Sequence, residues 1–369
     1  MLRIGNIQLH GGSTTTALRT RAICFTAQRG GGKHREVSAS GSSDVATHAS
    51  SERSRLPTEA QTSTVIEMGD PLSVETLPRT VRVATLPVAS LPAVLHELLA
   101  LTLFAADERA SDERGGFFFS ISIAEQRNVT IVSVPEAFTG IAGCAGFEMD
   151  PTEWSVVRVG EGALGFETIG VVERLTQPLA QIGVPVLYFS TFLTDYVLLP
   201  LGRLEEALGH LTMNLSSGDQ AASSANSDSA VAAWHTHPLT VLDDGPSTLI
   251  LRLDKRERQR HTGALLRLLL MPHARDGLQS IASLTETSDE ISILASGSGW
   301  WREYVSDHLA SGGSGEGIQG DPHGAWVPIR VGSLDDGTPL DETGVVATQA
   351  KVLAGVGIPI LYLSTCTCR

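Results

Sequence analysis

Two rhythms of apolar and polar positions run through residues 80–215, and they predict alternating strands and helices. The segments 91–105, 170–183 and 201–211 carry apolar residues at helical spacing, for example Leu91, Leu95 and Leu98. Gly183 and Pro185 favour a helix end, because glycine accepts a left-handed conformation and proline cannot continue a helix. Short runs rich in β-branched and aromatic residues predict strands at 81–87, 117–123, 129–134, 155–160, 184–190 and 196–200.

The same pattern is written twice. Residues 170–191 recur as 344–365 without a gap, with half of the positions identical. Upstream, 154–168 matches 326–343 once a short insertion is allowed, and 120–133 is faintly similar to 281–296. We therefore predict two related halves, at about 80–215 and 247–369.

Each half divides again into units with the order strand, helix, strand, strand, helix, which is the ferredoxin-like βαββαβ plan. The predicted class is α+β, with four such units in two related halves. The last unit is predicted to be truncated, because it has no counterpart of the 196–200 strand, and this loss leaves neighbouring strands unpaired. The predicted divisions are a disordered tail at 1–79, units at 80–150 and 151–215, a flexible linker at 216–246, and units at 247–311 and 312–369 (incomplete).

Composition narrows the function. A formal charge of −14 argues against nucleic acid or an anionic membrane as the main partner, because phosphate binding requires clustered Lys and Arg. No apolar run reaches the roughly 18–20 residues of a membrane span. The cysteines are too few for a disulfide framework and predict reduced thiols in the cytoplasm. They are Cys24, Cys144, Cys366 and Cys368.

The N-terminal segment has a different composition. Residues 1–35 carry six Lys or Arg and no Asp or Glu, with Ser and Thr between them. This composition is typical of a mitochondrial transit peptide, of a plain disordered tail, or of a start codon placed too far upstream. The composition does not distinguish these alternatives.

Candidate catalytic and metal chemistry is sparse. His235 and His237 have a metal-like spacing, but they lie in the polar linker, where a rigid ligand set is hard to build. Cys366 and Cys368 lack a second pair of ligands. No nucleophile motif or phosphate-binding loop is evident. We expect a chain that is not an enzyme and that uses no metal and no cofactor.

Acidic residues open each repeated helix, with Glu167 before the first and Asp341 and Glu342 before the second. Such residues complement the helix dipole in any protein. Alternatively, the exposed N–H groups there receive a ligand carboxylate while an acid receives its ammonium group. Both interpretations fit the sequence.

The repeated block resembles the CASTOR family of ACT-domain arginine sensors. The similarity rests on Ser190, Thr191, Thr194, Asp195 and Tyr196, and on the runs RVGEGALGFETIGVV, QPLA and SLTETSDEISIL. It covers about residues 80–369 in the same order, including the polar linker. The resemblance implies tandem ACT units and an amino-acid ligand held between the second and fourth units.

The family's ligand residues correspond to nine positions here. They are Pro185, Val186, Pro339, Asp341, Glu342, Gly344, Val345, Thr365 and Cys366. The family has serine at Pro185, glycine at Pro339 and an aromatic residue at Cys366. Its acid for the guanidinium group falls at Arg369, whereas Glu342 matches and would hold an α-amino group.

The resemblance also implies protein partners. Phe192, Leu193 and Asp195 occupy the surface that the family uses to bind a nutrient-signalling complex upstream of TORC1, although an ordinary strand-connecting loop explains them equally well. The family dimerises through its first and third units, so a homodimer is expected. Two other functions stay open: a ligand-independent interaction scaffold, and a regulatory portion of an amino-acid biosynthetic enzyme.

Overall fold

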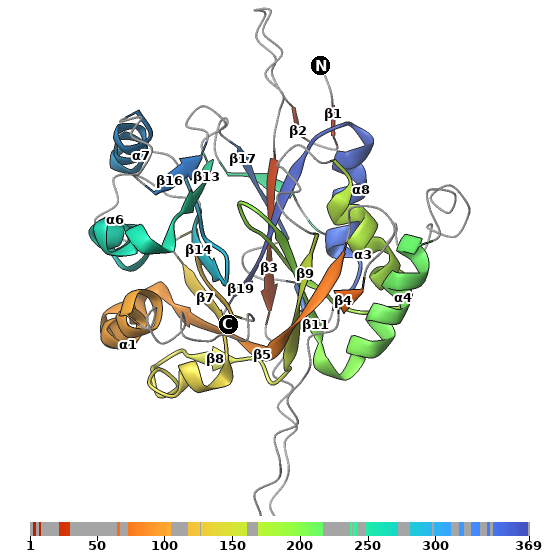
Figure 1. Cartoon of the computed structure of the whole chain (residues 1–369), viewed down its shortest axis with the longest axis horizontal. Helices are drawn as coiled ribbons and strands as arrows, with labels where there is room; N and C mark the ends of the chain where they lie inside the picture. Colours follow the sequence, from red (N-terminus) through yellow and green to blue (C-terminus); the bar gives the residue numbers. More distant parts are fainter. Residues whose placement is uncertain are drawn as a thin grey trace, which may run out of the picture.

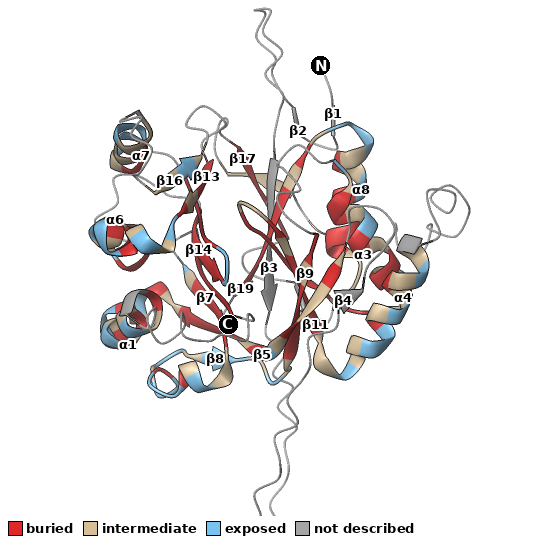
Figure 2. Ribbon diagram, viewed as in Figure 1, coloured by how far each residue is buried: buried red, intermediate tan, exposed pale blue. Residues whose placement is uncertain are grey.

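Two β-sheets stack face to face, and helices cover the outer face of each sheet (Figure 1). Buried residues concentrate along the strands and on the inward faces of the helices (Figure 2). The computed structural model describes residues 3–4, 7–8, 22–29, 65–66, 73–104, 117–125, 127–160, 169–216, 237, 239–242, 248–271, 281–296, 299–310, 317–320, 326–332, 338–339 and 342–367.

The first sheet joins the first and third units. All of its pairings are antiparallel, in the order β8–β5–β7–β6–β14–β15–β13–β16, and the β6–β14 pair makes the junction. The strands are β5 (Val74–Pro87), β6 (Phe118–Ala124), β7 (Asn128–Ser133), β8 (Glu148–Met149), β13 (Thr248–Leu253), β14 (Ile281–Thr287), β15 (Ile291–Ser296) and β16 (Ile318–Gly320).

Helices of these two units pack their apolar residues on the outer face of the first sheet. Leu98, Leu265 and Trp301 contribute to this core and are almost fully buried. The helical segments are η1 (Val88–Val94), α1 (Leu95–Leu99), η2 (Ala100–Phe104), η3 (Pro135–Phe138), η5 (Lys255–Glu257), α6 (Arg258–Leu270) and α7 (Trp300–Ala310).

The second sheet joins the second and fourth units, in the order β4–β5–β9–β11–β10–β19–β3–β17–β12. Strand β3 runs parallel to β17, β18 and β19, and the other pairings are antiparallel. The strands beyond β5 are β3 (Ala22–Arg29), β4 (Val65–Ile66), β9 (Trp154–Val159), β10 (Leu187–Ser190), β11 (Asp195–Pro200), β12 (Leu239–Val241), β17 (Val327–Val331), β18 (Thr338–Pro339) and β19 (Ile360–Thr367).

The helices on this side are α3 (Val171–Gln181), η4 (Leu201–Arg203), α4 (Leu204–Ser216) and α8 (Val345–Gly355). Separately, β1 (Arg3–Ile4) pairs with β2 (Ile7–Gln8). Strand β5 belongs to both sheets, because its first part pairs with β9 and its last part with β7. This long strand therefore ties the two sheets together.

The repeated helices end as their sequence predicts. Gly183 and Gly357 have φ angles of 63° and 72°, in the left-handed region that glycine accepts readily. The Val184 N–H donates to the Leu179 carbonyl at 2.9 Å, and the Ile358 N–H donates to the Leu353 carbonyl at 3.0 Å. These bonds satisfy carbonyls that a helix end otherwise leaves unpaired.

The structure differs from the sequence-based expectation at the N-terminal tail and in the linker. Composition predicted disorder over 1–79, yet Ala22–Arg29 forms β3 and β5 begins at Val74. Leu239–Val241, inside the expected linker, forms β12 beside β17. In the fourth unit, β17 and β19 were expected to lack a partner, but β3 pairs with both. The physical reason is that short apolar runs within polar segments find partners far away in the sequence.

Among the described residues, no helix is long and apolar enough to cross a bilayer. In the same part of the chain, no group of three His, Cys, Asp or Glu is placed to hold a metal ion.

Candidate ligand site between the second and fourth units

The second and fourth units meet through equivalent elements. Strand β10 pairs with β19 at Phe189 and Leu363. The Tyr188 N–H donates to Ser364 Oγ at 2.9 Å, and the Tyr362 N–H donates to Ser190 Oγ at 3.0 Å. Each serine hydroxyl therefore accepts a backbone N–H from the opposite strand. The two bonds are equivalent by the internal repeat, as expected of a pseudo-two-fold junction.

One apolar core continues across this junction. Val186, at the start of the second unit's strand, and Val345, the first residue of α8, belong to the same buried cluster. A Cβ atom on Gly344 would lie 3.7 Å from the Ala180 Cβ, so the start of α8 lies against the end of α3. Val186 and Val345 therefore contribute to one core, and a ligand site between the second and fourth units stays a prediction.

The α8 N-terminus resembles the start of α3. Gly344 and Gly170 occupy the N-cap positions with φ angles of 82° and 86°, and neither helix has a side-chain hydrogen bond at its cap. The first N–H groups of a helix have no partner within that helix. They and the positive end of the helix dipole favour an anion at this place.

Glu342 lies two residues before the N-cap residue, Gly344. Its Oε1 lies 2.6 Å from His237 Nε2, and the two side chains are 23 % and 13 % exposed. The acid that sequence reasoning assigned to a ligand amine therefore contacts a group of the same chain. Sequence reasoning treated His237 as a metal candidate and missed this pairing, because the two residues are far apart in the sequence.

The remaining predicted residues lie on β18 and β19, beside β3. The register pairs Thr365 with Ala27, Cys366 with Gln28, and Pro339 with Arg29. Cys366 packs in the apolar cluster between the two sheets. Thr130 Oγ1 accepts from the Cys366 N–H at 2.8 Å and donates to the Cys366 carbonyl at 3.1 Å. Pro185 is half-buried, and Asp341 and Arg369 lie outside the described residues.

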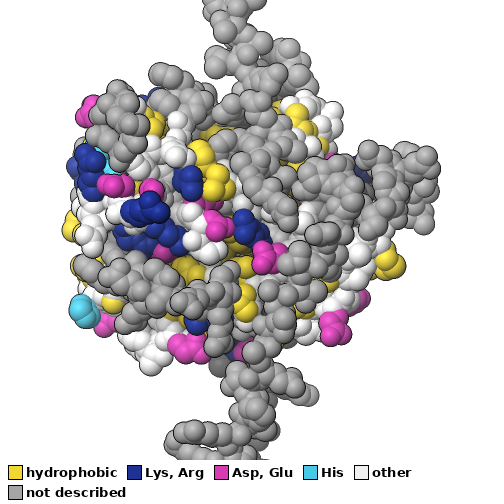
Figure 3. All heavy atoms as spheres, viewed as in Figure 1, with side chains coloured by type: hydrophobic (Ala, Val, Ile, Leu, Met, Phe, Trp, Pro, Cys, Tyr) yellow, Lys and Arg dark blue, Asp and Glu magenta, His cyan; other side chains and the backbone are white. Residues whose placement is uncertain are grey.

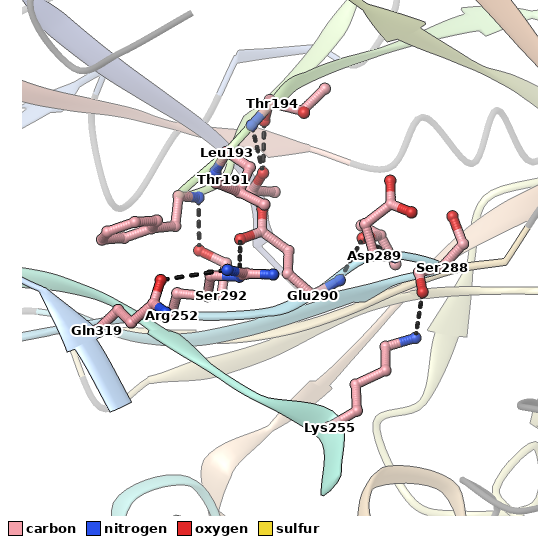
Figure 4. Close-up of polar contacts among 12 residues, drawn as sticks. Thr191, Leu193, Thr194, Arg252, Lys255, Ser288, Asp289, Glu290, Ser292 and Gln319 are labelled. Carbon is pink, nitrogen blue, oxygen red and sulfur yellow. Dashed lines mark hydrogen bonds and ion pairs between the residues drawn. The ribbon is translucent and has the colours of Figure 1, made fainter. Parts of the chain in front are cut away.

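The loop assigned to partner binding is held by the third unit (Figure 4). The Phe192 N–H donates to Ser292 Oγ at 3.0 Å, and the Leu193 N–H donates to Glu290 Oε1 at 3.0 Å. Within the loop, the Thr191 N–H donates to the Thr194 carbonyl at 3.0 Å. The loop residues therefore have a structural role, and their role in partner binding remains a prediction.

A buried carboxylate, Glu290, and a half-buried one, Asp195, anchor this region. Burial raises the pKa of Glu290, although hydrogen bonds from Thr191 and the Leu193 N–H and the nearby Arg252 charge act against the rise. Burial likewise raises the pKa of Asp195, opposed by hydrogen bonds from Ser190 and Tyr188. The Tyr188 hydroxyl donates to Asp195 Oδ2 at 2.9 Å. Asp195 thus points into the fold, toward Tyr188.

We expect Glu290→Gln to flatten the dependence of stability on pH. Because the folded-state pKa of Glu290 is raised, its contribution is fully present below the unfolded-state pKa and is lost as the pH rises through the folded-state pKa. Each pKa unit corresponds to about 1.4 kcal/mol. Glutamine still accepts the Leu193 N–H. Urea unfolding of both proteins between pH 4 and 8 measures the difference, and Ser292→Ala serves as the control that keeps the titrating group.

Basic and acidic side chains lie side by side on the surface near α6. On the face drawn in Figure 3, Lys and Arg side chains gather beside acidic ones. Lys255 Nζ lies 3.8 Å from Glu286 Oε1, and Arg252 Nε lies 3.9 Å from Glu290 Oε2. These basic groups therefore face acids of the same chain.

The architecture is α+β and is built from tandem ACT-like units. Residues 151–212, which contain β9, α3, β10, β11 and most of α4, match the ACT domain family. The prediction of α+β ACT units is confirmed.

Among curated proteins, the chain is similar to the "Cytosolic arginine sensor for mTORC1 subunit 1" of Rattus norvegicus, with 30 % identity over 125 residues, or 32 % of this chain and 38 % of that protein. The Bos taurus protein of the same name is 29 % identical over 136 residues, or 34 % and 41 %. The match spans about two-fifths of the length of these relatives. The resemblance to the CASTOR family is thereby confirmed.

Solved structures with partial similarity include an aspartate kinase from Synechocystis, with 13 % identity, a TM-score of 0.31, and coverage of 77 % of this chain and 49 % of that one. The protein Atu0741 from Agobacterium tumefaciens gives 23 % identity and a TM-score of 0.27, covering 38 % of this chain and 86 % of that one.

Proposed function

We propose that this chain is a non-catalytic regulatory protein that binds an amino acid where its second and fourth units meet. The observation that carries the proposal is the shared core of Val186 and Val345, with the uncapped start of α8 and the Glu342 carboxylate beside it. The helix N–H groups would receive the α-carboxylate, and Glu342 would receive the α-ammonium group. The ACT match at 151–212 supports the same function.

We further propose that the amino acid is arginine and that the chain signals nutrient status to a TORC1-pathway complex in the cytoplasm. The names of the relatives, cytosolic arginine sensors for mTORC1, support it. The loop residues Phe192 and Leu193 are the proposed partner surface, and a homodimer is the proposed assembly. Pro185 and Cys366 differ from the family's residues, so other amino acids belong in the test.

Thermal unfolding in the presence of each proteinogenic amino acid tests the proposal. A ligand at 100 times its dissociation constant stabilises the folded state by about 2.7 kcal/mol. Glu342→Ala is expected to abolish the shift, because it removes the carboxylate that receives the ammonium group. Glu205→Ala, on the exposed face of α4, is the matched control and should leave the shift intact. An unchanged shift in Glu342→Ala would place the ligand elsewhere.

His237→Ala is expected to tighten ligand binding. The His237 ring lies 2.6 Å from Glu342 Oε1, so it competes with a ligand amine for this oxygen. Removing a partly exposed pair of this kind changes the binding free energy by about 0.5–1 kcal/mol, which corresponds to roughly 2- to 5-fold in affinity. Isothermal titration calorimetry of both proteins provides the comparison. Weaker binding by His237→Ala would mean that His237 helps to hold the ligand.

A ligand-independent scaffold is the second candidate, and the His237–Glu342 contact favours it, because the acid already has a partner. On this alternative, no amino acid shifts the unfolding temperature, and His237→Ala and Glu342→Ala both lower it.

A further inference from the structure

Strand β3 occupies a place in the fourth unit that has a direct counterpart in the second. In the second unit, β11 lies between β9 and β10, antiparallel to both. In the fourth unit, the equivalent strands are β17 and β19, and β3 lies between them, parallel to both. The tight loop after β10 requires β11 to run antiparallel to it, whereas β3 comes from a distant part of the sequence and has no such constraint.

The backbone pairing of β3 is extensive. It pairs with β19 from Ala22 to Arg29 and with β17 from Ala22 to Thr26, and β18 continues beside Gln28 and Arg29. A strand flanked on both sides uses its backbone N–H and C=O groups in both directions. Without a strand here, β17 and β19 would each expose an unpaired edge, which readily accepts another extended segment.

We call the space between β17 and β19 the slot. Both of these flanking strands also pair with strands other than β3. On its far side β17 pairs with β12 from Leu239 to Val241. On its far side β19 is joined to β10 through Ser190 and Ser364. The rest of the sheet therefore holds both flanking strands, β17 and β19, in the absence of β3 as well.

The residues of β3 suit a central strand. AICFTA is a run of apolar and small residues, as expected where both faces of a parallel sheet are covered. The register sets Ile23 level with Leu361 and Phe25 level with Leu363, and both leucines belong to the core between the sheets. The slot therefore suits an extended peptide with small and apolar residues.

We propose that the slot between β17 and β19 is a binding site for an extended peptide strand, filled in the same chain by residues 22–29. A tight loop to β10 fixes the register of β11. The partners of β3 are distant in the sequence, so β3 is held by backbone pairing to the edges of β17 and β19. Recognition of this kind is β-strand addition, in which main-chain hydrogen bonds provide affinity and alternate side chains provide selectivity. The site is separate from the proposed amino-acid function and does not depend on it.

The experiment uses the full chain with a specific protease site inserted after Ser43, between β3 and β4. After cleavage, we expect the N-terminal fragment to co-elute with the rest of the protein in gel filtration. Amide hydrogen exchange over residues 22–29 should be at least about 100-fold slower than in an unstructured peptide, before and after cleavage. A labelled peptide of residues 20–31 should replace the fragment in the cleaved protein, and a peptide of the same composition in scrambled order should not.

Separation of the fragment at once, with unprotected exchange over residues 22–29, would overturn the proposal. Protection that disappears when a dimer is diluted would also overturn it, because the strand would then come from a second copy. Phe25→Pro provides a second readout, since proline removes a donor from the middle of the strand. It should abolish protection across β3, whereas Ser50→Pro, outside the strand, should leave it unchanged.

Discussion

Replacing Arg258 by alanine is expected to lower the free energy of unfolding by about 3–5 kcal/mol. Arg258 is 4 % exposed, and its guanidinium group forms an ion pair with Glu286, which is 2 % exposed. Its Nη1 also donates to the Thr102 carbonyl at 3.4 Å. The alanine variant leaves the Glu286 carboxylate buried without this partner, and the cost of a buried charge dominates the effect.

A double variant separates this cost from the loss of packing. Arg258→Met combined with Glu286→Leu removes both charges and keeps apolar volume, so its destabilisation should be smaller than that of Arg258→Ala. Lys255, which lies near Glu286, keeps its bond to the Ser288 carbonyl at 3.0 Å. Urea unfolding followed by tryptophan fluorescence measures all three proteins. A double variant at least as unstable as Arg258→Ala would contradict the interpretation.

The pair also explains how the first and third units are joined. Arg258 begins α6, Glu286 lies on β14, and Thr102 belongs to the helical segment of the first unit. The β6–β14 pairing supplies backbone bonds at the same junction. Loss of the ion pair should therefore weaken contacts between units as well as within the third unit.

The sequence predicted the features that local chemistry encodes. The repeated block specified α3 and α8 with their left-handed glycines, Gly183 and Gly357, because helical periodicity and a Gly–X–Pro ending are short-range signals. The order strand, helix, strand, strand, helix in the second unit is also found as predicted. Val186 and Val345 lie in one buried core. That the second and fourth units adjoin was implied by the resemblance rather than by any local pattern.

The features that the sequence did not predict depend on contacts between distant segments. Residues 22–29 lie among Arg, Ser and Thr, so composition favoured a tail, and their pairing with β17 and β19 is parallel and very long-range. His237 reaches Glu342 from a polar linker. The docking of Leu193 on Glu290 joins the second unit to the third. The hydrophobic pattern of one helix or strand does not predict which distant segment it contacts.

Phe118→Ala is expected to cost about 3–5 kcal/mol, the range for removing a buried aromatic side chain. Phe118 is 2 % exposed and lies on β6 of the first sheet, whereas its ring neighbours come from the second sheet. Its ring centroid is 5.5 Å from that of Phe189 in an edge-to-face arrangement, and 5.2 Å from that of Tyr196. The variant therefore opens a cavity between the two sheets rather than beneath the helices.

Because this cavity lies between the two sheets, Phe118→Ala tests whether they unfold together. If the two sheets share one cooperative core, Phe118→Ala should lower the midpoint of a single urea transition, seen alike by near-UV circular dichroism and tryptophan fluorescence. Met149→Ala, at a side chain that is 41 % exposed, should shift the midpoint by less than the equivalent of about 0.5 kcal/mol. Two separate transitions in Phe118→Ala would instead mean that each sheet folds with its own helices, and that the contacts between the two sheets do not couple them.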